Sequence, residues 1–315
     1  MHVYRWDLDK TYLETDFHSL RGLLRSATEP ARDKVTAPGA AAILRALSGV
    51  EENHIVIVSG SPTQLRPVLE EKLRLDGVRF DELILKDSLD KLKRGQVRSI
   101  RGQLGYKLPQ LLRLRVGWAP QAPETLFGDD AEVDAIVYAL YADALAGRLT
   151  GKQVAKAMRE GGAYDDEVDD AMGALARNVH SDAVARIFIR LTAGCSPTRF
   201  APLRGRVVPI HSWLQAALVL YEDGQLPAAA VLESAAEVLA AGLDAFMVSS
   251  LVQDIVRRGF IRKETPAGLD WPDALQPALR LALERTPDGP RVRPAGVPEG
   301  PLDYVQIIKG WRASA

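Results

Sequence analysis

The chain has little of what secreted, membrane-spanning or nucleic-acid-binding proteins need. Its 315 residues include one cysteine, Cys195, so neither an internal disulfide nor a pair of cysteine metal ligands can form. No stretch approaches the roughly 18 consecutive apolar residues of a transmembrane helix, and no basic segment followed by an apolar run suggests a secretory signal. With a formal net charge of −1, no overall field attracts nucleic acid. We therefore expect a cytoplasmic protein without specific nucleic-acid binding; peripheral contact with a membrane stays open.

What the chain does have is the composition of a globular protein. Apolar residues make up 47% of it and charged residues 26%, which is ordinary for proteins that bury a hydrophobic core. A length of 315 residues exceeds that of a typical single domain. Two domains are therefore the natural expectation.

Strand and helix patterns alternate over the first 150 residues. Short apolar or β-branched runs predict strands at 3–6, 54–58, 80–85 and 124–127. Apolar residues at helical spacing predict helices at 40–47, 64–75, 107–115 and 134–146. This alternation is typical of an α/β protein with a parallel, Rossmann-like sheet between two layers of helices. Ligands of such sheets bind outside the carboxyl ends of the strands.

Residues 151–286 favour helices and show little strand signal. Helical patterns recur at 165–178, 210–222, 226–243, 245–258 and 272–285. We predict that this part forms an all-helical accessory domain or flank. The tail, residues 287–315, begins rich in Pro and Gly, and its apolar end at 302–311 is expected to dock back onto the body.

Polar side chains follow three of the four predicted strands. Two carboxylates that are two residues apart in an extended chain point the same way and repel each other, unless a cation or phosphoryl chemistry uses them. A solvated turn is the alternative for the first pair taken alone. Clusters at three strand ends, all expected at one crevice, favour a functional site instead. These residues are Asp7, Asp9 and Thr11, then Ser59 and Gly60, then Asp129 and Asp130.

Taken together, these clusters resemble the haloacid dehalogenase (HAD) superfamily of phosphoryl-transfer enzymes. Its four motifs occur here in order, as Asp7-Leu8-Asp9-Lys10-Thr11, Ser59, Lys107 and Gly128-Asp129-Asp130 with Asp134. Ser59-Gly60-Ser61-Pro62, together with Tyr106-Lys107 and Asp134-x-x-x-Tyr138, is similar to the catalytic domain of actin-patch type phosphatidate phosphatases. The resemblance covers about residues 1–148, so we expect residues 1–150 to form a HAD-like phosphatase core with a minimal cap.

The resemblance implies a hydrolase that uses Mg²⁺ and an aspartyl-phosphate intermediate. Asp7 would be the nucleophile. Asp9 would protonate the leaving oxygen and then activate water, which favours phosphate esters as substrates. Lys107 would neutralise charge on Asp7 and on the transferring group. The metal ligands would be Asp7, the backbone carbonyl of Asp9, and Asp129. The phosphate-binding residues would be Thr11, Ser59 and Gly60. Asp130, near the metal, and Asp134, beside Lys107, would have supporting roles.

Segment lengths bear on the substrate. Residues 12–53 and 63–106 are too short for a large cap over a small metabolite, so the site suits a membrane-presented lipid such as phosphatidate unless the C-terminal helices form a lid. A basic cluster fits an anionic surface, with a solvated loop as the alternative. Two other functions stay open, a phosphatase for a protein or nucleic-acid phosphate and a non-enzymatic HAD-fold scaffold with a partner-binding helical half. The basic cluster comprises Lys86, Lys91, Lys93, Arg94, Arg98, Arg101, Lys107, Arg113 and Arg115.

Overall fold

A six-stranded parallel sheet organises the protein, with the strand order β3-β2-β1-β4-β5-β6. The structure is a computed structural model, and it describes residues 1–14, 29–86, 100–131, 133–192, 194–287 and 300–313. Every pair of neighbouring strands is parallel. The α/β fold with a parallel sheet flanked by helices is therefore confirmed. The strands are β1 (His2–Trp6), β2 (Asn53–Pro62), β3 (Glu82–Lys86), β4 (Glu124–Asp129), β5 (Val184–Arg190) and β6 (Val208–Ile210).

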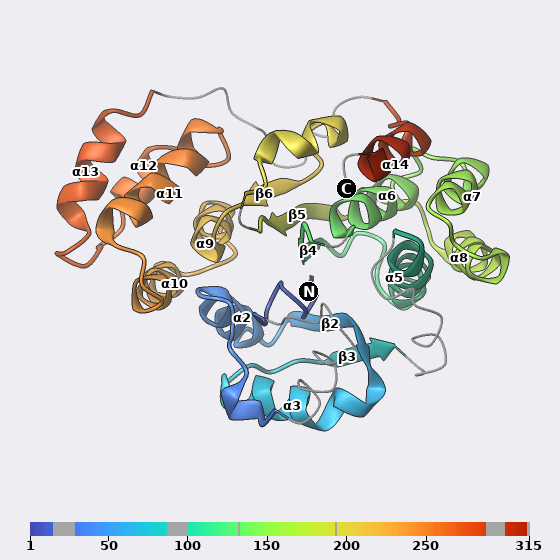
Figure 1. Ribbon diagram of the computed structural model, residues 1–315, viewed down its shortest axis with the longest axis horizontal. Helices are drawn as coiled ribbons and strands as arrows, with labels where there is room; N and C mark the ends of the chain where they lie inside the picture. Colours follow the sequence, from blue (N-terminus) through green and yellow to red (C-terminus); the bar gives the residue numbers. More distant parts are fainter. Residues whose placement is uncertain (15–28, 87–99, 132, 193, 288–299, 314–315) are drawn as a thin grey trace.

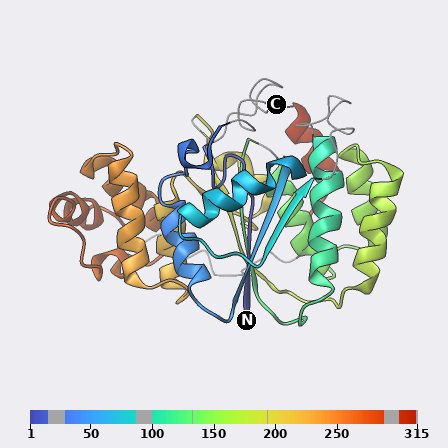
Figure 2. The same ribbon diagram turned by 90° about the horizontal axis from the view of Figure 1, so that it is seen from below.

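The strand order changes direction at β1, so the topological switch point of the sheet lies between β1 and β4. The chain first adds β2 and β3 on one side of β1 and then β4, β5 and β6 on the other. Trp6 pairs with Phe127 in register, so the residues after these two lie side by side at the carboxyl edge. The strands rise toward the top of Figure 2, away from the N-terminus at its bottom. Such a switch point is where open α/β sheets bind their ligands.

Hydrophobic cores cover both faces of the sheet, because side chains alternate along each strand. Two of them are large, and a third, small cluster contains Val3, Val56 and Val58. Tyr4 and Trp6 of β1 face the first core, and Leu126 of β4 faces the second. In Figure 1 the helices α9–α13 lie on the left, and α5–α8 with α14 lie on the right. The first core is covered by α2 (Ala40–Ser48), α3 (Arg66–Leu75), α9 (Trp213–Glu222), α10 (Ala228–Ala240), α11 (Ala245–Arg257) and α13 (Gln276–Glu284), and the second by α5 (Ile100–Arg115), α6 (Asp134–Leu145), α7 (Gly151–Glu160), α8 (Asp165–Arg177) and α14 (Tyr304–Ala313).

Two strands come from the half of the chain in which the sequence predicts helices. β5 pairs with β4, and β6 pairs with β5, so one sheet runs across residue 150. C-terminal helices are present as predicted, but the expectation of little strand structure is wrong for these two segments. β6 has three residues, too few for a periodic signal, and it becomes a strand by pairing with β5.

The end of the chain packs into the second core. Leu302, Tyr304, Ile308 and Trp311 are all buried there, and the Tyr304 hydroxyl donates to Asp143 Oδ2 at 2.8 Å. Residues 288–299 of the predicted tail lie outside the described residues. Among the helices that the structure describes, none has both the length and the apolar character needed to cross a membrane.

Short helical segments complete the fold. They are α12 (Glu264–Ala267) and the 3-10 turns η1 (Ala31–Asp33), η2 (Thr63–Leu65) and η3 (Pro197–Leu203).

Candidate active site

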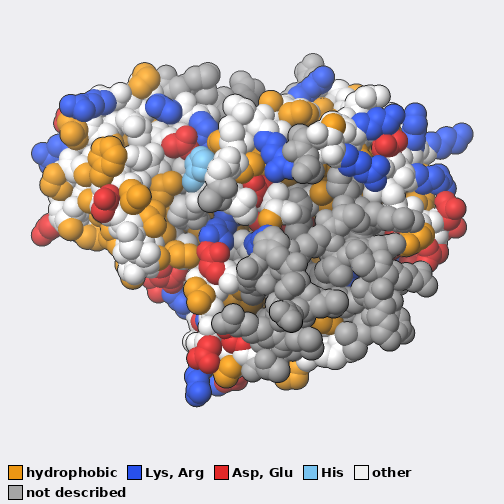
Figure 3. All heavy atoms as spheres, viewed as in Figure 1, with side chains coloured by type: hydrophobic (Ala, Val, Ile, Leu, Met, Phe, Trp, Pro, Cys, Tyr) orange, Lys and Arg blue, Asp and Glu red, His pale blue; other side chains and the backbone are white. Residues whose placement is uncertain are grey.

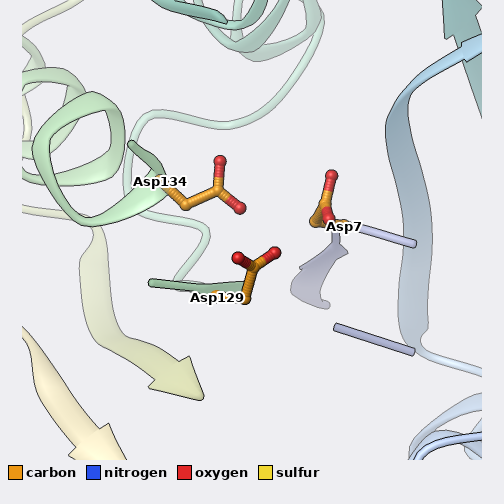
Figure 4. Close-up of side chains that lie close together, drawn as sticks. All are labelled: Asp7, Asp129 and Asp134. Carbon is orange, nitrogen blue, oxygen red and sulfur yellow. The ribbon is translucent and has the colours of Figure 1, made fainter. Parts of the chain in front are cut away.

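Three buried carboxylates meet where β1 and β4 end. Asp7 directly follows β1, Asp129 is the last residue of β4, and Asp134 begins α6. One oxygen from each lies within 4.8 Å of the other two, and Figure 4 shows the three side chains turned toward one another. The backbone holds Asp7 next to the end of β4, because the Asp7 amide donates a hydrogen bond to the Phe127 carbonyl at 3.0 Å. This bond continues the hydrogen-bond ladder between β1 and β4.

Lys107 and Thr11 connect the three carboxylates. The fully buried Lys107 Nζ donates to Asp7 Oδ1 at 2.9 Å and to Asp134 Oδ1 at 2.5 Å. The Thr11 hydroxyl lies 3.1 Å from Asp7 Oδ2 and 3.2 Å from Asp129 Oδ2. Because a hydroxyl has one proton, it donates a hydrogen bond to one of these two carboxylates at a time. Lys107 therefore contacts both Asp7 and Asp134, the two partners that the sequence analysis expects for it.

The three carboxylates form a donor set that fits a divalent metal ion. Mg²⁺ prefers hard oxygen ligands such as carboxylates, and like charges this close are costly unless positive charge accompanies them. Asp7 and Asp129, two of the residues predicted as metal ligands, both belong to the group, and Asp134 joins them. The carboxylate of Asp9 points elsewhere, so any part it takes in metal binding would come from its backbone carbonyl.

Asp9 faces the end of β2. Its Oδ2 accepts hydrogen bonds from the Ser59 hydroxyl at 3.1 Å and from the Ser61 hydroxyl at 2.8 Å. Asp9 and Gly60 are partly exposed, while Ser59 and Ser61 are buried. The structure thus brings the predicted residues Asp9, Ser59 and Gly60 to the edge of the sheet at which Asp7 lies. Ser61 belongs to the Ser59-Gly60-Ser61-Pro62 segment, and its hydrogen bond to Asp9 was not predicted from the sequence.

Asp130 is attached to β5 and does not belong to the group of three carboxylates. Its amide donates to the Arg190 carbonyl at 3.0 Å, and its Oδ1 accepts from the Thr192 amide at 2.7 Å. Burial, and then the nearby Asp130, raise the pKa of the Cys195 thiol, which therefore stays protonated near neutral pH. Asp130 thus joins the fourth motif to a strand that the sequence analysis did not predict.

Tyr138 is buried beside the carboxylates of the site. Burial raises the pKa of its phenol well above the usual value, and the carboxylate of Asp134 raises it further. A neutral phenol beside the carboxylates adds no charge. It packs close to Gly128, where a methyl group would lie 2.8 Å from Tyr138 Cε2 and 2.5 Å from Asp134 Oδ2. Glycine at 128 is what lets Asp134 and Tyr138 approach β4.

Replacing Gly128 with alanine is expected to destabilise the protein by about 1–3 kcal/mol, because overpacking a tight site costs that much. It should also lower catalytic activity more than tenfold, since Asp134 must move away from Lys107. Thermal unfolding and initial rates check both effects. Gly117→Ala is the matched control, because a methyl group there has nothing within 4 Å. Equal effects of the two substitutions would contradict the close packing described for Gly128.

Helix α5 places at the site two side chains to which the sequence gives no role. It begins at Ile100, whereas the sequence predicts a helix only from residue 107. The extra turns bring in Gln103, one turn before Lys107, and Tyr106, whose hydroxyl donates to the Ser59 carbonyl at 3.2 Å. Gln103 is buried, and its Oε1 has no hydrogen-bond partner among the described residues. The i, i+4 spacing of Gln103 and Lys107 is the signal that could have found it.

The predicted basic cluster is not a uniform surface. Lys107 is buried in the site, Arg115 is buried against Glu124 at 2.6 Å, and Arg113 pairs with Asp170 on α8. In Figure 3, Lys and Arg side chains gather at the upper right, where Figure 1 has α7 and α14, whereas the first turn of α8 is acidic. Positive surface charge there comes partly from helices outside residues 86–115. The side chains of Lys91, Lys93, Arg94, Arg98 and Arg101 lie outside the described residues, as do residues 15–28 and 87–99 of the two predicted cap segments.

Comparison with known proteins finds a family match in the first half of the chain. Residues 6–151 match the family model of phosphatidate phosphatase APP1, catalytic domain. No curated protein and no solved structure matches the chain. The resemblance inferred from the four motifs is thereby confirmed for this segment, and the HAD-like character is consistent with it. The match indicates a phosphatase, a hydrolase that acts on a phosphorylated substrate.

Proposed function

We propose that this APP1-like protein is a Mg²⁺-dependent phosphatidate phosphatase of the HAD type that works through an aspartyl-phosphate. One observation carries the proposal: Asp7 is buried between the Lys107 ammonium and the Thr11 hydroxyl, next to Asp129. In this proposal residues 1–150 supply every reacting group, while residues 151–286 and the tail 287–315 are accessory. The protein would meet its substrate from the cytoplasm, at a membrane surface.

In the first step the Asp7 carboxylate attacks the phosphorus atom. A bond forms between an Asp7 oxygen and phosphorus, and the bond from phosphorus to the ester oxygen breaks. Asp9 gives its proton to that oxygen, which leaves as an alcohol, diacylglycerol in the case of phosphatidate. Ser59 and Ser61 hold the Asp9 carboxyl group toward the end of β2, on the side where Gly60 would bind phosphate.

In the second step water releases the phosphate. Asp9, now a carboxylate, takes a proton from water as the water oxygen attacks phosphorus, and the bond between Asp7 and phosphorus breaks. Lys107 stays within hydrogen-bond distance of Asp7 and counters the negative charge that develops. Ser59, the Gly60 amide and Thr11 would bind the phosphate oxygens.

Asp7 and Asp129, with Asp134 beside them and the Asp9 carbonyl, would hold the Mg²⁺ ion, and Asp130 would support this end of β4. When bound, the ion supplies positive charge that offsets carboxylate repulsion and the charge of the phosphate. Asp134 has a second role, because it shares the Lys107 ammonium with Asp7 and so orients it.

Removing divalent metal with EDTA is expected to abolish hydrolysis, and adding Mg²⁺ should restore it. Mg²⁺ should also stabilise the folded protein, by about 2.7 kcal/mol at a concentration a hundredfold above its dissociation constant, because it binds the folded site alone. Thermal unfolding with and without Mg²⁺ measures this. Asp129→Asn should remove most of the stabilisation, whereas Asp33→Asn, on an exposed side chain, should keep it. Full activity in EDTA would contradict the metal assignment.

Gln103 is proposed to bind the phosphate of the substrate. Its Nε2, a hydrogen-bond donor, would lie 3.6 Å from a methyl group at Gly60, beside the amide that is proposed to bind phosphate. A hydrogen bond to a charged group is worth about 1.5–3 kcal/mol, so Gln103→Ala should raise KM roughly 10-fold or more. Gln110→Ala, on the same helix and partly exposed, is the control. Steady-state kinetics measure both, and an unchanged KM in Gln103→Ala would exclude this contact.

The substrate class is tested by comparing phosphatidate in mixed micelles with two water-soluble phosphates, an aryl phosphate and a phosphopeptide. The proposal expects kcat/KM to be highest for phosphatidate and Asp7→Asn to be inactive on all three. Preference for the phosphopeptide would favour the protein phosphatase instead. No hydrolysis of any of them with Mg²⁺ would favour the non-enzymatic scaffold.

A further inference from the structure

We infer that Arg190 and Trp213, both outside the segment that matches the catalytic-domain family, position the loop that carries Asp7 and Asp9. This inference rests on the proposed function, because it takes that loop as the catalytic one. Arg190 ends β5, and Trp213 begins α9. Each donates a hydrogen bond to a backbone carbonyl of the loop.

Trp213 holds the loop at Thr11. Its indole Nε1 donates to the Thr11 carbonyl at 2.9 Å in a fully buried contact. Its ring packs against Trp6, with centroids 5.0 Å apart, and against Phe127, at 6.0 Å. These are the last residue of β1 and the residue of β4 that pairs with it. Since the Thr11 hydroxyl lies against both Asp7 and Asp129, the indole fixes the residue that connects two carboxylates of the site.

Arg190 holds the loop one residue earlier. Its Nη1 donates to the Lys10 carbonyl at 3.0 Å, and its guanidinium also pairs with Glu14. Lys10 has a φ of 62°, a left-handed backbone conformation that is unfavourable for residues other than glycine. Such conformations persist where surrounding contacts impose them. The carbonyl of Arg190 also accepts from the Asp130 amide, so one residue of β5 contacts both the first and the fourth motif.

The two contacts together fix two successive peptide groups, those whose carbonyls belong to Lys10 and Thr11. Asp9 precedes this pair directly, and Asp7 precedes it by three residues. A nucleophile must lie within a fraction of an ångström of its productive position, and small misplacements cost large factors in rate. The second half of the chain therefore positions the catalytic loop through both hydrogen bonds, although every reacting group lies in residues 1–150.

The test uses two substitutions in the full-length chain, with matched controls. Trp213→Phe keeps a ring beside Trp6 but removes the N–H donor, and Arg190→Gln removes the guanidinium. The control for the first is Trp271→Phe, which removes an equivalent buried indole hydrogen bond, to the Pro266 carbonyl at 2.7 Å. The control for the second is Arg186→Gln: Arg186 lies on the same strand as Arg190, and the substitution removes its ion pair with Asp223. We expect kcat to fall at least about tenfold in the first two variants with KM within about twofold of wild type, and both constants to be unchanged in the controls.

Stability and metal binding separate positioning from general destabilisation. Unfolding temperatures should fall in the controls as well, whereas the affinity for Mg²⁺, measured by calorimetric titration of each protein with the metal alone, should weaken severalfold only in Trp213→Phe and Arg190→Gln. The inference would be overturned if the decrease in kcat were proportional to the decrease in unfolding temperature in all four variants. It would also be overturned if the Mg²⁺ affinity were unchanged in both Trp213→Phe and Arg190→Gln. If the wild-type protein binds Mg²⁺ but is inactive, the proposed function is contradicted. The Mg²⁺ affinities of the variants then still test whether Arg190 and Trp213 position the loop.

Discussion

Asp7→Asn is expected to lower the rate of phosphate release by at least about a thousandfold, because the amide cannot act as the nucleophile that forms the aspartyl-phosphate. The substitution is nearly isosteric, and the amide can still accept a hydrogen bond from Lys107. The folded structure should therefore persist, with an unfolding temperature close to that of wild type. Initial rates with a generic aryl phosphate and Mg²⁺ measure the loss. Retention of full activity would contradict the assigned mechanism.

Asp9→Asn provides the internal comparison, because Asp9 moves the proton and forms no bond to phosphorus. Loss of a general acid costs about 10²–10⁴-fold, and the cost is larger when the leaving alkoxide is more basic. The variant should consequently lose more activity toward an alkyl phosphate than toward an aryl phosphate, whereas Asp7→Asn should lose both equally. A single-turnover burst of the phenol would show that the first step survives in Asp9→Asn. Identical losses on both substrates would assign Asp9 a role other than proton transfer.

Lys107→Met is expected to reduce activity by about 10²–10³-fold, the usual cost of removing one group that stabilises transition-state charge. It should also destabilise the protein by about 3–5 kcal/mol, because breaking a buried ion pair leaves Asp7 and Asp134 without this cation. The affinity for Mg²⁺ should rise at the same time, since the site has become more negative. Activity and metal affinity therefore change in opposite directions, which kinetics and calorimetric titration can show together.

Lys72→Met is the matched control for this substitution. Lys72, on α3, is buried and pairs at 2.8 Å with Asp76, the residue that follows this helix, and neither belongs to the group of Asp7, Asp129 and Asp134. Its loss should lower the unfolding temperature but leave kcat and Mg²⁺ affinity unchanged. A Lys107→Met variant that behaves like Lys72→Met would show that Lys107 has only a structural role.

Most of the residues of the candidate site could be found from the sequence. Asp7, Ser59 and Asp129 each follow or end a short apolar run, and parallel strands bring their carboxyl ends to one edge. Lys107 could be assigned only by its place in the order of motifs that resembles a known family. The start of α5 was missed because residues 100–106 carry weak apolar periodicity, and Gln103 was missed with it.

The sequence by itself determined which side chains stand at the strand ends, because strand and helix periodicity and strand-end chemistry are local properties of the chain. Only the tertiary structure decided that Arg115 is buried against Glu124 and that β5 and β6 extend the sheet. It also decided that Trp213, 202 residues from Thr11 along the chain, donates to the Thr11 carbonyl. Such contacts arise from packing between distant segments, and no pattern within one segment records its partner.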